Sequence, residues 1–274
     1  MSGPAAVTAH YAREGIADRI LAALRAEHGA EVAVTPETLA PLDHFHGRGV
    51  AATAELLAVL DPQPGERLLD IGSGIGGPAR WIAARTGCHV TGVDLTPEFC
   101  AAAVALNVAT GLADRVRILT GSATNLPLPD AAFDRAYSQN VAMNIADKQR
   151  FYAEARRVLK PGGVLALSNL AAGANGPPRY PLPWAATEET SFLATPAETR
   201  AAIEAAGFEI VAFHDLTAKV QAFNDDMRAR AKAGAPLRLG MAVLVGEAMA
   251  ERQRNSASGI AEGTLIAIEV LARR

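Results

Sequence analysis

Apolar residues along this chain gather in short runs that predict a series of β-strands. In Arg67–Ile71, for example, three of the five positions are apolar, and a glycine follows directly. Short apolar runs that end at glycine, proline or small polar residues are typical of strands in the interior of a sheet. We expect seven such strands, at 67–71, 89–94, 116–120, 134–138, 164–169, 208–216 and 264–271.

Between the strands, apolar residues recur at spacings of three and four, which places them on one face of a helix. The segment Thr96-Pro97-Glu98 offers an N-cap, a proline for the first helical position and an early acid. Asp147 can cap the next helix, which the run from Lys160 to Gly163 would stop. Further helices are expected at 8–24, 50–60 and 196–206, with a polar stretch at 35–38 and a loop at 43–49.

Strands and helices alternate from residue 65 to residue 170, and this order predicts an α/β fold with a parallel sheet covered on both faces. The chain has 274 residues, half of them apolar, so it can bury a large core. We expect one α/β domain at 61–274, preceded by an N-terminal helical extension at 1–60. Insertions at about 173–195 and 218–262 would form a helical cap with the extension, and the second could also form the face of a homodimer.

Charge and cysteine content narrow the range of ligands. The formal net charge is −3, without a cluster of Lys and Arg, so we expect a small-molecule ligand and no nucleic acid. Cys88 and Cys100 are the only cysteines and form no CxxC pair, which argues against a zinc site and a secreted disulfide framework. No apolar run approaches the ~20 residues of a membrane helix, so the expected protein is cytoplasmic and makes no membrane contact.

The most informative stretch runs from Asp70 to Gly77, at the end of the first predicted strand. A glycine-rich turn between a strand and a helix presents backbone N–H groups to a nucleotide-like ligand, and side chains there would hold the ligand away. The second strand ends at Asp94. A carboxylate about 20 residues beyond the turn can accept hydrogen bonds from both hydroxyls of a ribose.

The glycines of this turn fit two kinds of ligand. Gly72, Gly74 and Gly77 satisfy the dinucleotide pattern, whereas Asp70 with Gly72, Gly74 and Gly76 satisfies the acidic pattern of S-adenosylmethionine enzymes. The Asp70 carboxylate would repel a pyrophosphate and attract the ammonium of a methionyl group. Charge therefore favours S-adenosylmethionine as the cofactor.

Four ordered motifs between residues 65 and 169 make the chain similar to class I S-adenosylmethionine-dependent methyltransferases. Within that class it resembles the small-molecule branch that includes the sarcosine/dimethylglycine and tocopherol methyltransferases. The resemblance implies a Rossmann-like sheet of seven strands with an antiparallel last strand. The motifs are Leu69–Arg80, Gly92–Thr96, Asn125–Asp134 and Arg157–Gly163.

The resemblance also assigns contacts to the cofactor. Asp94 is expected to bind the ribose hydroxyls, and Leu95 to lie against the adenine. The turn residues expected near the methionyl and ribose groups are Asp70, Gly72, Ser73, Gly74 and Gly76.

Three further cofactor contacts are expected outside the turn. Ser122 and Ala123 stand where the class commonly has an acid near the adenine amino group, so the contact there should be weaker or made by backbone. Gln139 follows the fourth strand and should meet the methionyl group. Tyr11 should lie over the cofactor, as an N-terminal aromatic does in similar methyltransferases.

The predicted acceptor site lacks an obvious general base. Related O-methyltransferases often place a histidine after the fourth strand, but 141–145 holds neither histidine nor acid, and the fifth strand ends at Asn169. An acceptor with a free lone pair suits this arrangement, because positioning then supplies most of the catalysis. We therefore expect methylation of an amine nitrogen, with O- or C-methylation of a phenol, quinone or similar molecule as the alternative.

His46 is the candidate catalytic base, since His44 and His46 precede the core and could reach the mouth of the pocket. The alternative is a pair of loop histidines hydrogen-bonded to backbone. No metal site is expected, because no third ligand lies near the two histidines in sequence. Five aromatic residues outside the motifs could hold a cationic group or simply pack the cap on the core: Tyr11, Phe45, Tyr180, Trp184 and Phe192.

Two readings from other functional classes stay open at this point. A nicotinamide oxidoreductase would share the sheet, but no Tyr and Lys four residues apart lie on a plausible helix. A cofactor-binding protein without transferase activity would share the fold.

Arg179 could bind a carboxylate of the acceptor or be an ordinary exposed loop arginine.

Overall fold

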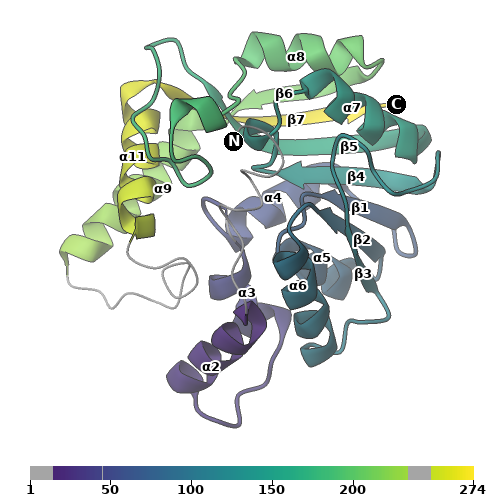
Figure 1. The fold of residues 1–274 in the computed structure, drawn as a ribbon, viewed down its shortest axis with the longest axis vertical. Coiled ribbons are helices and arrows are strands. Elements are labelled where there is room, and N and C mark those ends of the chain that lie inside the picture. The colour runs from purple at the N-terminus through teal and green to yellow at the C-terminus, as the bar shows by residue number, and fades with distance from the viewer. Residues whose placement is uncertain (1–14, 45, 234–247) are drawn as a thin grey trace.

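The computed structural model describes residues 15–44, 46–233 and 248–274. Seven strands form one sheet in the order β3-β2-β1-β4-β5-β7-β6 (Figure 1). Their bounds are β1 Arg67–Ile71, β2 His89–Asp94, β3 Val116–Thr120, β4 Phe133–Gln139, β5 Leu159–Ala172, β6 Glu209–Asp215 and β7 Leu265–Arg273.

The strands pair as the sequence predicts. The contacts of β1 with β2 and β4, of β2 with β3 and of β4 with β5 are parallel. The last strand, β7, lies between β5 and β6 and is antiparallel to both. The expected Rossmann-like sheet with an antiparallel last strand is therefore confirmed. β5 is longer than predicted, because its carboxyl half pairs with β7 through Ala172.

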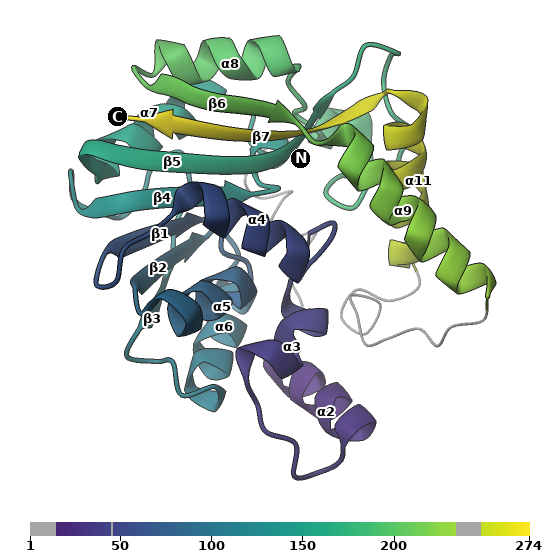
Figure 2. The ribbon, with the colours of Figure 1, turned by 180° about the vertical axis from the view of Figure 1, so that it is seen from behind.

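Helices cover both faces of this sheet (Figures 1 and 2). On one face α4 and α5 pack against the strands, α7 and α8 pack on the other, and α6 contacts β2 and β3. The helices are α2 Ile16–His28, α3 Pro36–Asp43, α4 Val50–Leu60, α5 Gly77–Thr86, α6 Pro97–Ala109, α7 Lys148–Val158, α8 Pro196–Ala205, α9 Thr217–Lys232 and α11 Ala248–Glu262, with short 3-10 turns η1 Ala142–Asn144 and η2 Glu188–Thr190.

Helix α3 occupies the segment that begins as the expected polar stretch. Thr35 caps it: the Thr35 hydroxyl accepts from Thr38 N (3.2 Å), Thr38 Oγ1 accepts from Thr35 N (2.9 Å), and Pro36 takes the first helical position. The helix before it was expected at 8–24; the described part, α2, starts at Ile16 and continues to His28. Residues 8–14 lie outside the described part.

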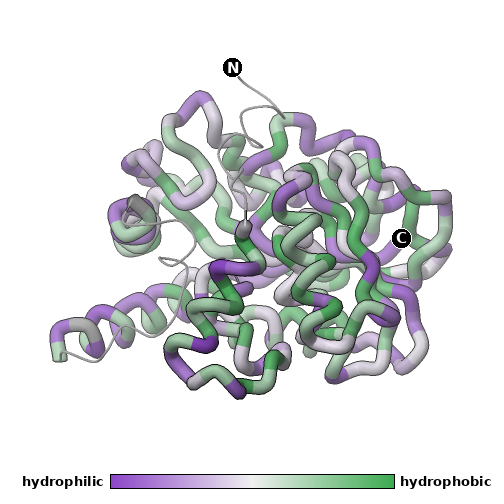
Figure 3. Tube along the Cα trace, turned by 60° about the horizontal axis from the view of Figure 1, so that its bottom comes forward, coloured by the Kyte–Doolittle hydropathy of each residue, from purple (hydrophilic) through white to green (hydrophobic). Residues whose placement is uncertain are grey.

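Two apolar cores hold the helices on the sheet. Leu56 and Leu60 of α4 pack with Leu68 of β1 and with Tyr137 of β4. On the opposite face Phe151 and the rest of the apolar stripe of α7 pack against β4 and β5. Figure 3 shows the hydrophobic positions concentrated among the strands and hydrophilic positions along the outer segments.

The carboxyl ends of the parallel strands point to a region bounded by α2 and α3 on one side and by α9 and α11 on the other (Figures 1 and 2). A buried ion pair fixes α3 there, since Arg80 Nη2 of α5 donates to Asp43 Oδ2 (2.9 Å). Ligands of open α/β sheets bind at this edge. None of the helices in the described ranges is both long and apolar enough to span a bilayer.

Candidate functional site

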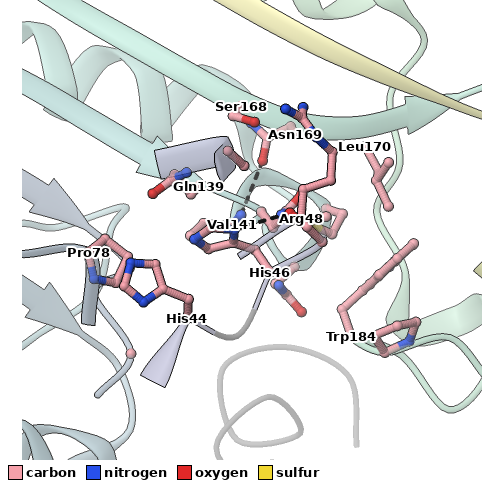
Figure 4. A pocket seen from close by; sticks show the side chains of 18 of the residues that line it. His44, His46, Arg48, Pro78, Gln139, Val141, Ser168, Asn169, Leu170 and Trp184 are labelled. Atoms are coloured by element: carbon pink, nitrogen blue, oxygen red, sulfur yellow. Dashed lines mark hydrogen bonds between the residues drawn. The ribbon is translucent and has the colours of Figure 1, made fainter. Parts of the chain in front are cut away.

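A cavity of about 1520 Å³ opens at the carboxyl edge of the sheet. Single-ligand pockets commonly measure about 300 to 1,000 Å³, so this space can hold a cofactor and a second small molecule. One half is walled by the glycine turn, the end of β2 and residues 121–124. The other half is walled by the ends of β4 and β5 together with α9 and α11. Figure 4 shows the region where the two halves meet.

The glycine turn has a backbone that other residues would strain. Gly72, Gly74 and Gly76 have φ angles of 83°, 53° and 77°, in the left-handed region. A Cβ on Gly72 would lie 2.3 Å from Val141 Cγ2, so the turn also packs closely on the segment after β4. Gly77 has a packing role, because a Cβ there would lie 2.1 Å from the Asp43 carbonyl oxygen of α3.

Asp94 is held in place by the turn itself. Gly74 N donates to Asp94 Oδ2 (2.8 Å), and Thr96 N donates to Asp94 Oδ1 (2.9 Å). Burial raises the pKa of this carboxyl, and the two backbone donors oppose the rise. Leu95 lines the cavity beside it. The structure therefore brings the expected ribose and adenine contacts to the same wall as the turn.

Asp70 is the most unusual charge in the cavity wall. The residue is 3% exposed, and its Oδ2 has no hydrogen-bond partner among the described residues. Burial raises the pKa of the carboxyl to about 7, with Tyr137 opposing the rise and the Asp94 carboxylate adding to it. A buried acid without a counter-charge is suited to receive a cation.

Gln139, at the end of β4, connects to two residues from the segment before the sheet. Thr53 Oγ1 donates to Gln139 Oε1 (3.2 Å) and lies 3.2 Å from His46 Nε2. The other ring nitrogen, His46 Nδ1, lies 3.3 Å from the Gly47 carbonyl oxygen. Burial and the neighbouring His44 lower the pKa of His46 to about 4. His46 therefore lines the cavity as a neutral ring that is a weak base.

His44 lies deeper than His46 and is oriented by a carboxylate. Its Nδ1 is 2.9 Å from Asp43 Oδ1, and its side chain is fully buried. Asp43 also binds Arg80, which in turn donates to Asn107 Oδ1 (2.9 Å) and to the Ile75 carbonyl oxygen (2.7 Å). This network anchors α3 on α5 and α6 beside the glycine turn.

The segment after β4 is fixed by side chains from two elements. Asn169 Oδ1 accepts from Val141 N (3.1 Å) and Ala142 N (3.3 Å). Lys148 Nζ donates to the carbonyl oxygens of Ala142 (2.7 Å) and Phe192 (2.6 Å), and also to that of Ile145. Burial lowers the pKa of Lys148 to about 8. These contacts position the backbone between the two halves of the cavity.

Ten of the expected site residues line the cavity: Asp70, Gly72, Ser73, Gly74, Asp94, Leu95, Ser122, Ala123, Gln139 and His46. Gly76 instead supplies the left-handed cap of α5. The Ser122 hydroxyl is 2.9 Å from Thr124 Oγ1. Tyr11 and Phe45 lie outside the described residues.

The cap contributes Trp184 and Phe192 to the cavity wall, whereas Tyr180 and Arg179 do not line it. The Trp184 indole N–H donates to Ser191 Oγ (3.0 Å). Both cysteines are buried and free. No group of three or more His, Cys, Asp and Glu side chains suited to a metal occurs within the described part of the chain.

Sequence reasoning missed Thr53 and Arg48, whereas α9 and α11 fall within the cap insertion expected at 218–262. Arg48 lines the cavity and forms an ion pair with Glu55, which also binds Lys219 Nζ of α9 (2.7 Å). Thr53 lies on the expected helix 50–60, and an apolar helix with one buried threonine facing the sheet is the signal that could have singled it out.

Known proteins are similar to the central part of this chain, which carries the glycine turn and the end of β4. Residues 69–167 match the methyltransferase domain model. A sterol 24-C-methyltransferase of Gibberella zeae is 38% identical over 102 residues, which are 37% of this chain and 27% of that protein. The glycine/sarcosine/dimethylglycine N-methyltransferase of Actinopolyspora halophila is 31% identical over 154 residues, or 56% of this chain and 27% of that protein.

The fold extends beyond the matched segment. The crystal structure of geranyl diphosphate C-methyltransferase from Streptomyces coelicolor A3(2) is similar with a TM-score of 0.71 at 16% identity, covering 99% of this chain and 97% of the other. The two sequence relatives match over about a quarter of their own length. The chain therefore contains a methyltransferase domain on the fold of class I S-adenosylmethionine-dependent methyltransferases.

Proposed function

We propose that this protein transfers a methyl group from S-adenosylmethionine to a small molecule, most simply to an amine nitrogen. The observation that carries the proposal is Asp70, a carboxylate buried at the glycine turn with one oxygen unpartnered in the described structure. A methionyl ammonium would supply the missing counter-charge. The pyrophosphate of a dinucleotide would add a second negative charge at the same place, so the proposal disfavours a nicotinamide cofactor.

The residues present fit S-adenosylmethionine along its whole length. Asp70 and Ser73 would meet the methionyl group, Asp94 the ribose hydroxyls, and Leu95 with the backbone at 121–123 the adenine. Ser73 Oγ, like Asp70 Oδ2, is buried without a partner among the described residues, which leaves a donor for the ligand. When bound, the cofactor supplies a methyl group on a cationic sulfur that leaves as a neutral thioether.

The other half of the cavity would hold the acceptor. Its described wall contains the apolar side chains of Met143, Leu170, Trp184 and Phe192 and several polar or charged ones, among them Arg48, Asn169, Arg228 and Arg254. A wall of this kind would orient the acceptor against the cofactor, and positioning is the main catalytic contribution in a direct displacement.

An amine acceptor is proposed because the site offers no strong base. His46 has its pKa lowered to about 4, and Asn169 uses its oxygen to hold the segment after β4. A neutral amine attacks with its own lone pair and can release its proton to solvent after transfer. An alcohol would need a base to remove its proton during attack. A phenolate or an activated carbon is the second candidate, since both are nucleophilic without such a base.

Calorimetry with S-adenosylmethionine and with NAD, followed by transfer of a labelled methyl group to amines, phenols and carboxylates, tests the proposal. We expect binding of S-adenosylmethionine and methylation of one or more amines. Asp70→Asn should weaken cofactor binding while leaving the fold intact. Binding of NAD without S-adenosylmethionine would refute the assignment, and transfer confined to unactivated alcohols would refute the amine.

A further inference from the structure

Three side chains form a row from the loop before α4 to the end of β4. His46 Nε2 lies 3.2 Å from Thr53 Oγ1, and Thr53 Oγ1 lies 3.2 Å from Gln139 Oε1. Thr53 is fully buried, Gln139 is 9% exposed and His46 is partly buried, so bulk water has little access to the Thr53–Gln139 contact. Figure 4 shows His46 and Gln139 around the same hollow as Val141.

The number of hydrogens on these side chains limits which atom can donate in each contact of the row. A threonine hydroxyl has one hydrogen, and here it is donated to Gln139 Oε1. With the Gln139 amide in this orientation, the Thr53 oxygen can only accept from His46, which puts the hydrogen of the neutral imidazole on Nε2 and leaves Nδ1 facing the Gly47 carbonyl oxygen without one. In that arrangement the Gln139 amide is fixed by its oxygen, and its NH2 group is left without a partner among the described residues.

Gln139 lies on the same face of the sheet as Asp70, the residue proposed to bind the methionyl ammonium. Asp70 of β1 is directly opposite Tyr137 of β4, and Gln139 follows Tyr137 by two residues on the same face of the sheet. In an amino-acid group the carboxylate is attached to the same carbon as the ammonium. A buried donor beside a buried acid therefore matches both charges of that group.

We propose that Gln139 donates its amide NH2 to the carboxylate of the methionyl group, and that Thr53 and His46 are positioning residues that hold the amide in this orientation. This inference rests on the proposed function. It gives His46 a part that does not require it to accept a proton. It also explains why a threonine is buried on the otherwise apolar inner face of α4.

The opposite arrangement makes a different prediction. If the imidazole hydrogen were on Nδ1, it would point at the Gly47 carbonyl oxygen 3.3 Å away, and Nε2 would accept from Thr53. The Gln139 amide would then donate to Thr53 and turn its oxygen to the cavity, where it would attract an ammonium and repel a carboxylate. The two tautomers of one ring thus present opposite groups to the ligand.

Binding of S-adenosylmethionine and of its decarboxylated analogue, measured by calorimetry without acceptor, separates these cases. For the wild type, loss of the carboxylate should weaken binding about tenfold or more, the usual effect of a hydrogen bond to a charged group. Thr53→Val keeps the shape of the side chain and should weaken binding of S-adenosylmethionine about fivefold to tenfold, with little change for the analogue. Thr53→Ser restores the hydroxyl and should restore affinity.

Substitutions at the two ends of the row complete the test. Gln139→Glu should weaken binding of S-adenosylmethionine more than that of the analogue, because it places a carboxylate against a carboxylate. His46→Gln retains a donor in place of Nε2 and should bind normally, whereas His46→Phe should behave like Thr53→Val. In ¹⁵N NMR spectra the His46 ring should carry its hydrogen on Nε2.

The outcomes distinguish this inference from the proposed function. A wild type that fails to bind S-adenosylmethionine refutes the proposed function and the inference with it. A wild type that binds, with Thr53→Val equal to it or with Gln139→Glu binding more tightly, refutes the inference alone. If Thr53→Val has a lowered melting temperature, Gln139→Glu and the NMR tautomer decide the result.

Discussion

The affinity for S-adenosylmethionine should depend on pH through Asp70. In the empty protein, burial raises the pKa of this carboxyl to about 7, so near neutral pH a large fraction of the molecules hold it protonated. A bound ammonium would favour the ionised carboxylate and lower that pKa. Binding should therefore release a proton, and the affinity should fall as the pH decreases below 7.

The size of the effect follows from the pKa of the empty site. One pH unit corresponds to about 1.4 kcal/mol for a group that must lose its proton to bind. Between pH 7.5 and pH 5.5 the dissociation constant should increase about 20-fold, provided that the pKa in the complex lies below 5. Across this range the α-ammonium of the ligand stays protonated, and His46, with its pKa of about 4, stays neutral.

Isothermal titration calorimetry at several pH values, in buffers with different enthalpies of ionisation, measures both the affinity and the proton release. Close to one proton should be released near pH 6. Asp70→Asn should bind more weakly at pH 7.5 and show little dependence on pH. Asp94→Asn is the comparison variant: it removes the neighbouring carboxylate, which should move the pH dependence to somewhat lower pH but keep it, because Asp70 is still present. A flat profile for the wild type, or the same slope in Asp70→Asn, would refute the reasoning.

Three further predictions concern stability and the glycine turn. The pKa of Asp70 is about 7 in the folded protein and 3.8 for an unperturbed aspartate, so Asp70 lowers the free energy of unfolding as the pH rises between these values, by at most about 4 kcal/mol; Asp70→Asn should melt above the ligand-free wild type at pH 8, with the two converging near pH 4. Asp43→Asn leaves the Arg80 guanidinium buried without its carboxylate, and should cost about 3 to 5 kcal/mol in a chemical denaturation experiment; an unchanged denaturation midpoint would contradict this. Gly72→Ala places a methyl group against Val141 and should abolish measurable cofactor binding, and adding Val141→Ala should recover part of it if the clash is the cause.

The sequence predicted the sheet well because each strand is bounded locally. β1, β2 and β3 begin and end where the apolar runs meet glycine, proline or charged residues. β5 extends further than predicted because its amino end pairs with Phe133 of β4 and its carboxyl end pairs with β7, whose residues lie about a hundred positions away. Pairing between segments so far apart in the sequence cannot be recognised from the local pattern of apolar and polar residues.

Helix α3 was missed although its signals are present in the sequence. Thr35, Pro36 and Thr38 are an N-cap, a first-turn proline and a capping partner, and they were interpreted only as a polar stretch. The helix has few residues and little apolar periodicity, so its stability comes from packing on α5 through Asp43 and Arg80. Tertiary contacts decided the structure of this segment.

The candidate site also contains some residues that local sequence identifies and others that only tertiary packing brings together. Asp70, Asp94 and the glycines could be predicted because the backbone geometry at strand ends links residue type to position. Thr53 and Gln139 are 86 positions apart, and only the packing of α4 on the sheet brings them together. The acceptor half depends on α9, α11 and the cap segment, which share no motif that identifies a partner molecule.

Selectivity and instability at this site have one cause. Burial of the Asp70 carboxyl away from water disfavours its ionised form in the ligand-free protein. Ionisation above pH 4 therefore destabilises the fold. The same burial strengthens the attraction between the Asp70 carboxylate and a cation beside it, and the repulsion between that carboxylate and an anion. Exposing Asp70 to solvent would remove this destabilisation of the fold, but it would also weaken the discrimination between an ammonium and a phosphate. A buried acid without a counter-charge is therefore what we expect where a protein must bind the zwitterionic end of S-adenosylmethionine and exclude dinucleotides with the same glycine turn.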